Sequence, residues 1–252
     1  MGKKEVAWFS GGVSSFIAAY IRRKTLDEIF YIDIDDQHSD TMRFLQDCEK
    51  ALDKEIKIIK SEDESVQNVI KKYRFINSPY GSKCTQILKK KVRQVWEKSQ
   101  QGEMTYIWGY DGTERHRANR LRDTMPEYEH VFPLIDENLT KEEVHGMLRR
   151  LEIKRPVMYE MGYRNNNCIG CVKGGMGYWN KIRKDFPKVF AERAKIEREI
   201  GRSCINGVFL DELEPNRGRI EDEVMEECGI MCEIAYEKIN NKYHNNKTIK
   251  RS

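Results

Sequence analysis

Short apolar runs alternate with longer amphipathic stretches along the first 150 residues. The apolar runs have the length and boundaries of β-strands, and we predict strands at 5–9, 28–33, 55–60, 104–108 and 130–134. The stretches between them have helical spacing, and we predict helices at 14–24, 41–52, 64–72, 85–98, 115–122 and 140–151. Strands that alternate with helices predict an α/β fold with a doubly wound, mostly parallel, Rossmann-like sheet.

The pattern changes near residue 155. Three consecutive asparagines at 165–167 and several glycines mark an irregular segment, and one further helix is predicted at 187–200. We therefore expect an α/β domain at 1–155 and an irregular, cysteine-containing C-terminal extension at 156–252 that packs on it.

Composition excludes several classes of protein. The 252 residues carry 45 Lys and Arg against 41 Asp and Glu, a net charge of +4 that is too small to indicate a nucleic-acid-binding protein. The longest uncharged stretch, 6–21, holds serines and glycines at its centre, so it does not predict a membrane span. Seven cysteines, an odd number, argue against a secreted disulfide framework, and we expect a cytoplasmic protein.

A glycine-rich loop follows the first strand and opens the first helix. It reads Ser10-Gly11-Gly12-Val13-Ser14-Ser15. Glycines let a ligand approach the backbone closely, and a helix N-terminus attracts anions, so this loop predicts phosphate binding. The serine hydroxyls can add hydrogen bonds. The alternative is a tight strand-to-helix turn without a ligand.

The loop resembles the PP-loop of the adenine-nucleotide α-hydrolase superfamily, and within it the phosphoadenosine phosphosulfate (PAPS) reductase family. This resemblance implies that an adenine nucleotide, either ATP or adenylyl sulfate, binds here. Its implied ligands in the loop are Ser10, Gly11, Gly12, Ser14 and Ser15.

Two further segments continue the resemblance in chain order. The end of the second strand is similar to the family segment whose backbone reads adenine, which implies roles for Asp33 and Ile34. Residues 109–117 are similar to a family arginine motif: Gly109 and Arg117 match, and Asp111 stands where the family has arginine. Arg115 or Arg117 could then bind phosphate or sulfate, and a charged helix face is the alternative. Magnesium is a further cofactor that an ATP-binding member would require.

Cysteines supply the second candidate site. Cys168 and Cys171 form a Cys-x-x-Cys pair, which has the spacing of metal ligands or a redox dithiol. The resemblance implies a [4Fe-4S] cluster held by Cys84, Cys168 and Cys171, with Cys232 as one candidate for the fourth ligand. Zinc is the rival metal, and simple packing in a glycine-rich turn is the alternative.

A Glu-Cys-Gly segment lies near the C-terminus, at 227–229. It resembles the segment that carries the nucleophilic cysteine of sulfonucleotide reductases, which implies that Cys228 is a catalytic nucleophile. Met231 stands where the family has histidine, and Cys232 could act as a resolving thiol instead of a metal ligand. The alternative is an amphipathic helix with two buried cysteines.

These features leave three functions open. The first is a sulfonucleotide reductase-like enzyme with a thiol donor such as thioredoxin. The second is an ATP-dependent thiolation enzyme that acts on tRNA, DNA or a small molecule, for which the basic runs at 89–93 and 181–184 are candidate tRNA contacts. The third is a non-catalytic nucleotide-binding module. We expect no membrane partner, and a homodimer is compatible with each function.

Overall fold

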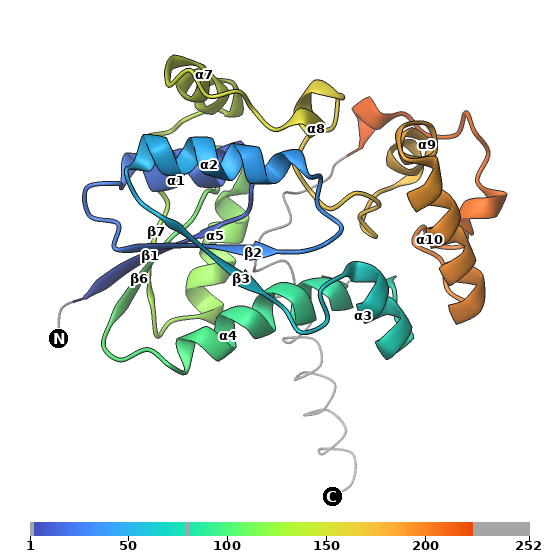
Figure 1. The fold of residues 1–252 in the computed structure, drawn as a ribbon, viewed down its shortest axis with the longest axis horizontal. Coiled ribbons are helices and arrows are strands. Elements are labelled where there is room, and N and C mark those ends of the chain that lie inside the picture. The colour runs from blue at the N-terminus through green and yellow to red at the C-terminus, as the bar shows by residue number, and fades with distance from the viewer. Residues whose placement is uncertain (1–2, 79–80, 224–252) are drawn as a thin grey trace, which may run out of the picture.

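A five-stranded parallel sheet forms the centre of the computed structural model, which describes residues 3–78 and 81–223 (Figure 1). Its strands are β1 (Lys4–Phe9), β2 (Glu28–Asp33), β3 (Ile56–Lys60), β6 (Met104–Ile107) and β7 (Glu129–Val131). They lie in the order β3-β2-β1-β6-β7, and each neighbouring pair is parallel. The chain runs outward from β1 first on one side and then on the other, so the doubly wound α/β fold is confirmed. A short hairpin of β4 (Asn77–Ser78) and β5 (Gly81–Ser82) lies apart from this sheet.

Helices cover both faces of the sheet. Figure 1 shows α1 and α2 across one face and α4 and α5 across the other. The helices of the α/β part are α1 (Val13–Ile21), α2 (Asp40–Leu52), α3 (Val66–Tyr73), α4 (Lys91–Glu97), α5 (Arg115–Thr124), α6 (Pro133–Asp136) and α7 (Lys141–Arg150). Those of the extension are α8 (Val157–Glu160), α9 (Met176–Asp185) and α10 (Pro187–Ile200).

Alternating side chains of the strands build two separate cores. On β1, Ala7 and Phe9 point into the core under α1 and α2, while Val6 and Trp8 point into the core on the opposite face. This is the period of two that a strand imposes on its side chains. The second core continues without interruption into the extension, where it includes Trp179. The division into two domains at residue 155 stays a prediction.

Two local predictions were wrong. The strand predicted at 130–134 ends at Val131, because Pro133 has no N–H for the sheet and instead begins α6. Helix α9 lies where an irregular segment was expected. In contrast, the helix predicted at 85–98 is present, as a π-helix over Thr85–Lys90 that continues into α4. The capping box of Thr140 and Glu143 is also present, at the start of α7.

No helix in the described part of the chain is long and apolar enough to cross a membrane.

His145 on α7 gives a prediction for stability. Its ring packs edge-on against Tyr159 of α8, with ring centroids 5.1 Å apart, and burial lowers its pKa from 6.5 to about 4. A histidine with a lowered pKa stabilises the fold above pH 6.5, where it is neutral in both states, and this stability is lost as the pH falls from about 6.5 to about 4. We expect His145→Phe, which keeps a ring against Tyr159, to lose less stability than the wild type over this interval.

Urea unfolding at pH 7 and pH 4.5 measures this effect. An equal loss of stability in both proteins between the two pH values would contradict the prediction.

Candidate functional site

The glycine-rich loop joins the central strand β1 to α1, at the carboxyl end of the sheet. Gly11 adopts a left-handed conformation with φ of +80°, which glycine allows at low cost. An added Cβ there would lie 3.1 Å from Thr41 Cγ2, so α2 also restricts this position. The loop lies where β1 separates the two halves of the sheet, which is the place where ligands bind in doubly wound folds.

The serine hydroxyls hold the loop together. Ser15 Oγ lies 2.7 Å from Ser10 Oγ, accepts a hydrogen bond from the Ser10 N–H at 3.2 Å, and donates to the Gly12 carbonyl at 3.0 Å. The Gly12 N–H donates to Ser10 Oγ at 3.2 Å. Ser14 is buried. These bonds fix the course of the backbone at the N-terminus of α1, the end of a helix that attracts anions.

The electrostatics of α1 favour an anion at its N-terminus. Its first turn carries no acidic residue, so no side chain of the helix itself neutralises the positive end of the helix dipole. Tyr159, from α8 in the extension, places its hydroxyl 3.5 Å from the Val13 N–H. The extension therefore forms one wall of the loop.

A second segment approaches the loop from β6. A Cβ added to Gly109 would lie 2.5 Å from Ser15 Cα and 2.6 Å from Ser15 N. Glycine at this position therefore lets the segment after β6 pack directly against the first turn of α1. This is the role that the structure gives to Gly109.

The two predicted arginines have internal partners. Arg117 is buried, forms an ion pair with Glu114, and stacks 4.4 Å from the centre of the Tyr110 ring. Arg115 donates to the Ile135 carbonyl at 3.4 Å. Asp111, at the position of the family arginine, caps the short helix 112–114 by accepting from the Thr113 N–H at 2.9 Å. Arginine binding to a nucleotide stays a prediction.

The residues predicted at the end of β2 point in different directions. Asp33 pairs with Lys60 of β3, with 3.1 Å between Lys60 Nζ and Asp33 Oδ2. Ile34 is buried in the core on the α3 side, where it lines the cavity described next. Neither side chain is shown at the glycine-rich loop, and recognition of adenine by the backbone here stays a prediction.

Three of the predicted metal ligands line one small cavity of about 10 Å³. Cys84 comes from the start of the π-helix, and Cys168 and Cys171 come from the loop before α9; Lys89 also lines the cavity. Thr85, at the position of the second family cysteine, lies 3.1 Å from Ser82 through their hydroxyl oxygens. The structure therefore places these three cysteines around one cavity, and their role as ligands stays a prediction.

The metal itself is not supported by the described residues. No set of three or more His, Cys, Asp or Glu within 3–78 and 81–223 is placed to hold a metal ion, and the cavity has room for about one water molecule. Cys228 and Cys232 lie outside the described residues. Among the described residues Cys204 is also buried, and burial raises its thiol pKa well above the ordinary value.

The backbone of the Cys-x-x-Cys loop is held firmly. The Tyr178 hydroxyl accepts from the Cys171 N–H at 2.9 Å and donates to the Cys168 carbonyl at 3.1 Å. The Ile169 N–H donates to the Asp36 carbonyl, after β2, at 2.7 Å. Burial raises the pKa of the nearby Asp36 carboxyl. The cysteine loop is therefore attached to the same strand end that was predicted to contact the nucleotide.

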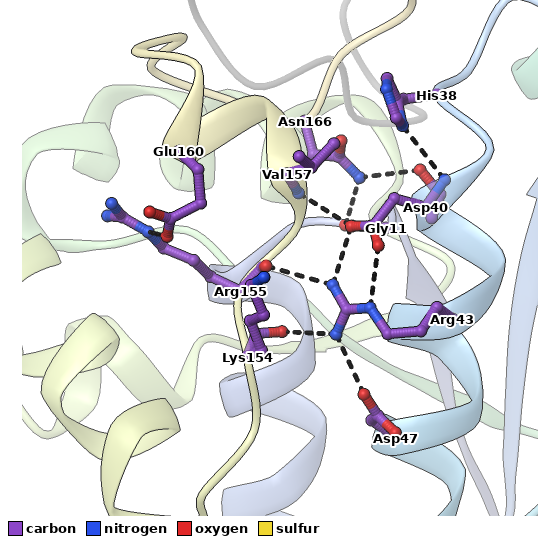
Figure 2. Close-up of polar contacts among 11 residues, drawn as sticks. Gly11, His38, Asp40, Arg43, Asp47, Lys154, Arg155, Val157, Glu160 and Asn166 are labelled. Atoms are coloured by element: carbon purple, nitrogen blue, oxygen red, sulfur yellow. Dashed lines mark hydrogen bonds and ion pairs between the residues drawn. The ribbon is translucent and has the colours of Figure 1, made fainter.

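Sequence reasoning missed Asn166, which lies between the two candidate sites. Figure 2 shows its amide beside Gly11, and its Nδ2 donates to the Gly11 carbonyl at 2.9 Å. Residues 154–157 precede Asn166 in the chain and are attached to α2. Arg43 and Asp40 of α2 bind backbone groups of these residues through hydrogen bonds of 2.7–3.1 Å. Three asparagines directly before Cys-x-x-Cys were the available signal, but they indicated only an irregular segment.

Three of the four basic side chains in the run at 89–93 are buried, and Lys91 is exposed. Lys89, Lys90 and Arg93 are only 7%, 9% and 3% exposed. Arg93 pairs with Glu97 at 3.2 Å. These side chains therefore do not offer the exposed cationic stripe that tRNA would require.

The chain is similar to known proteins over most of its length. The family described as phosphoadenosine phosphosulfate reductase domain matches residues 4–174. Uncharacterized protein MJ0066 of Methanocaldococcus jannaschii is 25% identical over 202 residues, which make up 76% of this chain and 41% of that protein. The phosphoadenylyl-sulfate (PAPS) reductase from Candida auris, solved as a phosphate complex, gives a TM-score of 0.44 at 12% identity over 66% of this chain and 81% of that chain.

The family match begins at β1 and ends after the Cys-x-x-Cys loop, so it includes both candidate sites. The fold and its loop define a PP-loop α/β domain. The chain belongs to the phosphoadenosine phosphosulfate reductase domain family. The matched part of the chain covers 41% of the length of its Methanocaldococcus relative.

The close approach of Gly109 to α1 gives a prediction with an internal control. We expect Gly109→Ala to destabilise the fold by on the order of 2 kcal/mol, because its Cβ would overlap the backbone of Ser15. Gly112→Ala is the matched control, since a Cβ at Gly112 meets nothing within 4 Å. Urea unfolding of both variants measures the difference. Equal stabilities would show that the two segments do not pack as described.

Proposed function

We propose that this protein is an enzyme of sulfur chemistry that binds the phosphate group of an adenine nucleotide at residues 10–15. The observation that carries this proposal is the left-handed Gly11 turn. It joins the central strand to a helix whose first turn has no acidic residue, in a chain of the PAPS reductase family. ATP and adenylyl sulfate are the two candidate nucleotides, with magnesium as a companion of ATP.

The reaction that we favour is reduction of a sulfonucleotide, with Cys228 as the nucleophile. The Cys228 thiolate attacks the sulfur of adenylyl sulfate, a sulfur–sulfur bond forms, and the bond from sulfur to the phosphate oxygen breaks, so that AMP leaves. A dithiol partner such as thioredoxin then attacks the Cys228 sulfur and releases sulfite. Its second thiol resolves the mixed disulfide, so the partner supplies both electrons.

The surroundings proposed for this reaction suit a thiol nucleophile. The cytoplasmic location predicted from the cysteine content would keep Cys228 reduced. The [4Fe-4S] cluster and the zinc site stay predictions for Cys84, Cys168 and Cys171, and analysis of iron, sulfide and zinc in protein purified without air distinguishes them. Formation of a homodimer is compatible with this function and stays a prediction.

The second candidate is ATP-dependent thiolation of tRNA, DNA or a small molecule. The observation that favours it is the group of three cysteines around one cavity beside the nucleotide-binding domain, together with aspartate at the position of the family arginine. In this reaction the enzyme would adenylate a carbonyl oxygen of its substrate, and a sulfur nucleophile would displace AMP.

The products distinguish these functions. We expect wild-type protein, supplied with adenylyl sulfate and a dithiol, to release sulfite and AMP, and Cys228→Ser to release neither. Full activity of Cys228→Ser would overturn the reductase mechanism. Conversion of ATP to AMP and pyrophosphate would indicate thiolation, and nucleotide binding without turnover would indicate a non-catalytic module.

The loop itself is tested by substitution at Gly11. Alanine at Gly11 must adopt a left-handed conformation, which costs about 1–2 kcal/mol, and it also crowds Thr41. Gly201→Ala has the same backbone cost at φ of +73°, but its Cβ meets nothing within 4 Å and it lies at the end of α10. We expect Gly11→Ala to weaken AMP binding at least about tenfold and Gly201→Ala to leave it unchanged, as measured by calorimetry. Equal affinity in both variants would mean that the nucleotide binds elsewhere.

A further inference from the structure

Asn166 connects three segments that are far apart in the sequence. Its side chain is buried, and Nδ2 donates to the Gly11 carbonyl at 2.9 Å and to Thr41 Oγ1 at 3.1 Å. Gly11 belongs to the glycine-rich loop, and Thr41 belongs to the first turn of α2. Both donor hydrogens of one amide group are therefore used to hold the loop against α2.

The hydrogen bond to Gly11 fixes the orientation of a peptide group. The Gly11 carbonyl and the Gly12 N–H belong to one rigid plane and point in opposite directions. Neither glycine has a Cβ, so this plane can rotate at a low steric cost. With the carbonyl held by Asn166, the Gly12 N–H faces Ser10 Oγ at 3.2 Å. A rotated plane would instead turn the Gly11 carbonyl oxygen, which repels anions, toward Ser10 Oγ inside the glycine-rich loop.

Asn166 is itself held in place from both sides. Before it, Asp40 accepts a hydrogen bond from the Val157 N–H at 2.8 Å, and Arg43 binds the Lys154 and Arg155 carbonyls (Figure 2). After it, the Ile169 N–H donates to the Asp36 carbonyl at 2.7 Å. The amide therefore reaches the loop from a backbone with little freedom to move, which is what a positioning residue requires.

We propose that Asn166 is a positioning residue for nucleotide binding, which holds the Gly11–Gly12 peptide in the orientation that accepts a phosphate group. The proposal rests on the function proposed above, because it requires a nucleotide phosphate at this loop. It assigns a role in the binding site to the extension, through a side chain two positions before Cys168.

Asn180 provides a matched control within the same chain. It is 6% exposed, against 4% for Asn166, and its Nδ2 also donates two hydrogen bonds, to the Glu214 and Arg217 carbonyls at 2.8 Å each. Alanine at either position removes one buried amide and two hydrogen bonds. The two variants thus lose the same kind of structural interaction, but only one of them loses a contact with the glycine-rich loop.

The experiment measures AMP and ATP affinity by calorimetry, together with urea unfolding, for wild type, Asn166→Ala and Asn180→Ala. We expect Asn166→Ala to bind both nucleotides at least about tenfold more weakly, and Asn180→Ala to bind them within about twofold of wild type. We expect similar losses of stability in the two variants. Thr41→Val removes only the second acceptor and should weaken binding less than Asn166→Ala does.

Two results are distinguished by this design. Wild-type protein without affinity for AMP or ATP would overturn the proposed function. Wild-type binding with equal affinities in Asn166→Ala and Asn180→Ala would overturn only the role of Asn166. If Asn166→Ala does not fold, the isosteric variant Asn166→Asp tests the proposal instead. We expect this variant to bind nucleotide more weakly than wild type does, because its carboxylate would face the Gly11 carbonyl and the phosphate. Wild-type affinity in Asn166→Asp would overturn the proposal.

Discussion

The close approach of α1 to the ends of the central strands is the constraint on which the rest of this structure depends. Gly11 makes the turn in a left-handed conformation, and Gly109 lets the segment after β6 touch the Ser15 backbone. A side chain at Gly109 would overlap the Ser15 backbone and force the first turn of α1 away from the sheet, and one at Gly11 would crowd Thr41. Because the loop is closed internally by serine hydroxyls, its shape exists before any ligand binds, and a phosphate need not order it.

The extension packs against the glycine-rich loop of the α/β part of the chain. It supplies the Tyr159 hydroxyl beside the Val13 N–H and the Asn166 amide on the Gly11 carbonyl. On the opposite face of the sheet, one core continues from Trp8 to Trp179 without a break. Removal of the extension would therefore expose apolar surface and also take away one wall of the loop.

Prediction from the sequence was most accurate for elements that local sequence signals determine. Strand β2 and helix α10 lie at their predicted residues, because a buried apolar run and an N-terminal proline are local signals. Helix α9 was missed because glycines at its start read as a loop. They are required there by distant contacts: a Cβ at Gly175 would lie 2.4 Å from the Glu223 carboxylate, and one at Gly177 would lie 2.3 Å from the Arg219 backbone. Arg117 likewise matched a family binding motif, but its partners in the structure, Glu114 and the Tyr110 ring, are internal.

The two candidate sites share one short segment, and this links their energetics. Residues 166–169 hold the Gly11 carbonyl at one end and the Asp36 carbonyl at the other, and Cys168 lies between these two hydrogen bonds. A ligand that binds the loop only while Asn166 is in place also favours the backbone position that places Cys168 at its cavity. If ligand binding requires Asn166 as proposed, a change at the cysteines that displaces this segment weakens binding at the loop, and by linkage a bound ligand opposes that change by the same factor. The Tyr178 hydroxyl, which accepts from the Cys171 N–H and donates to the Cys168 carbonyl, holds the cysteine end of this segment in the observed position.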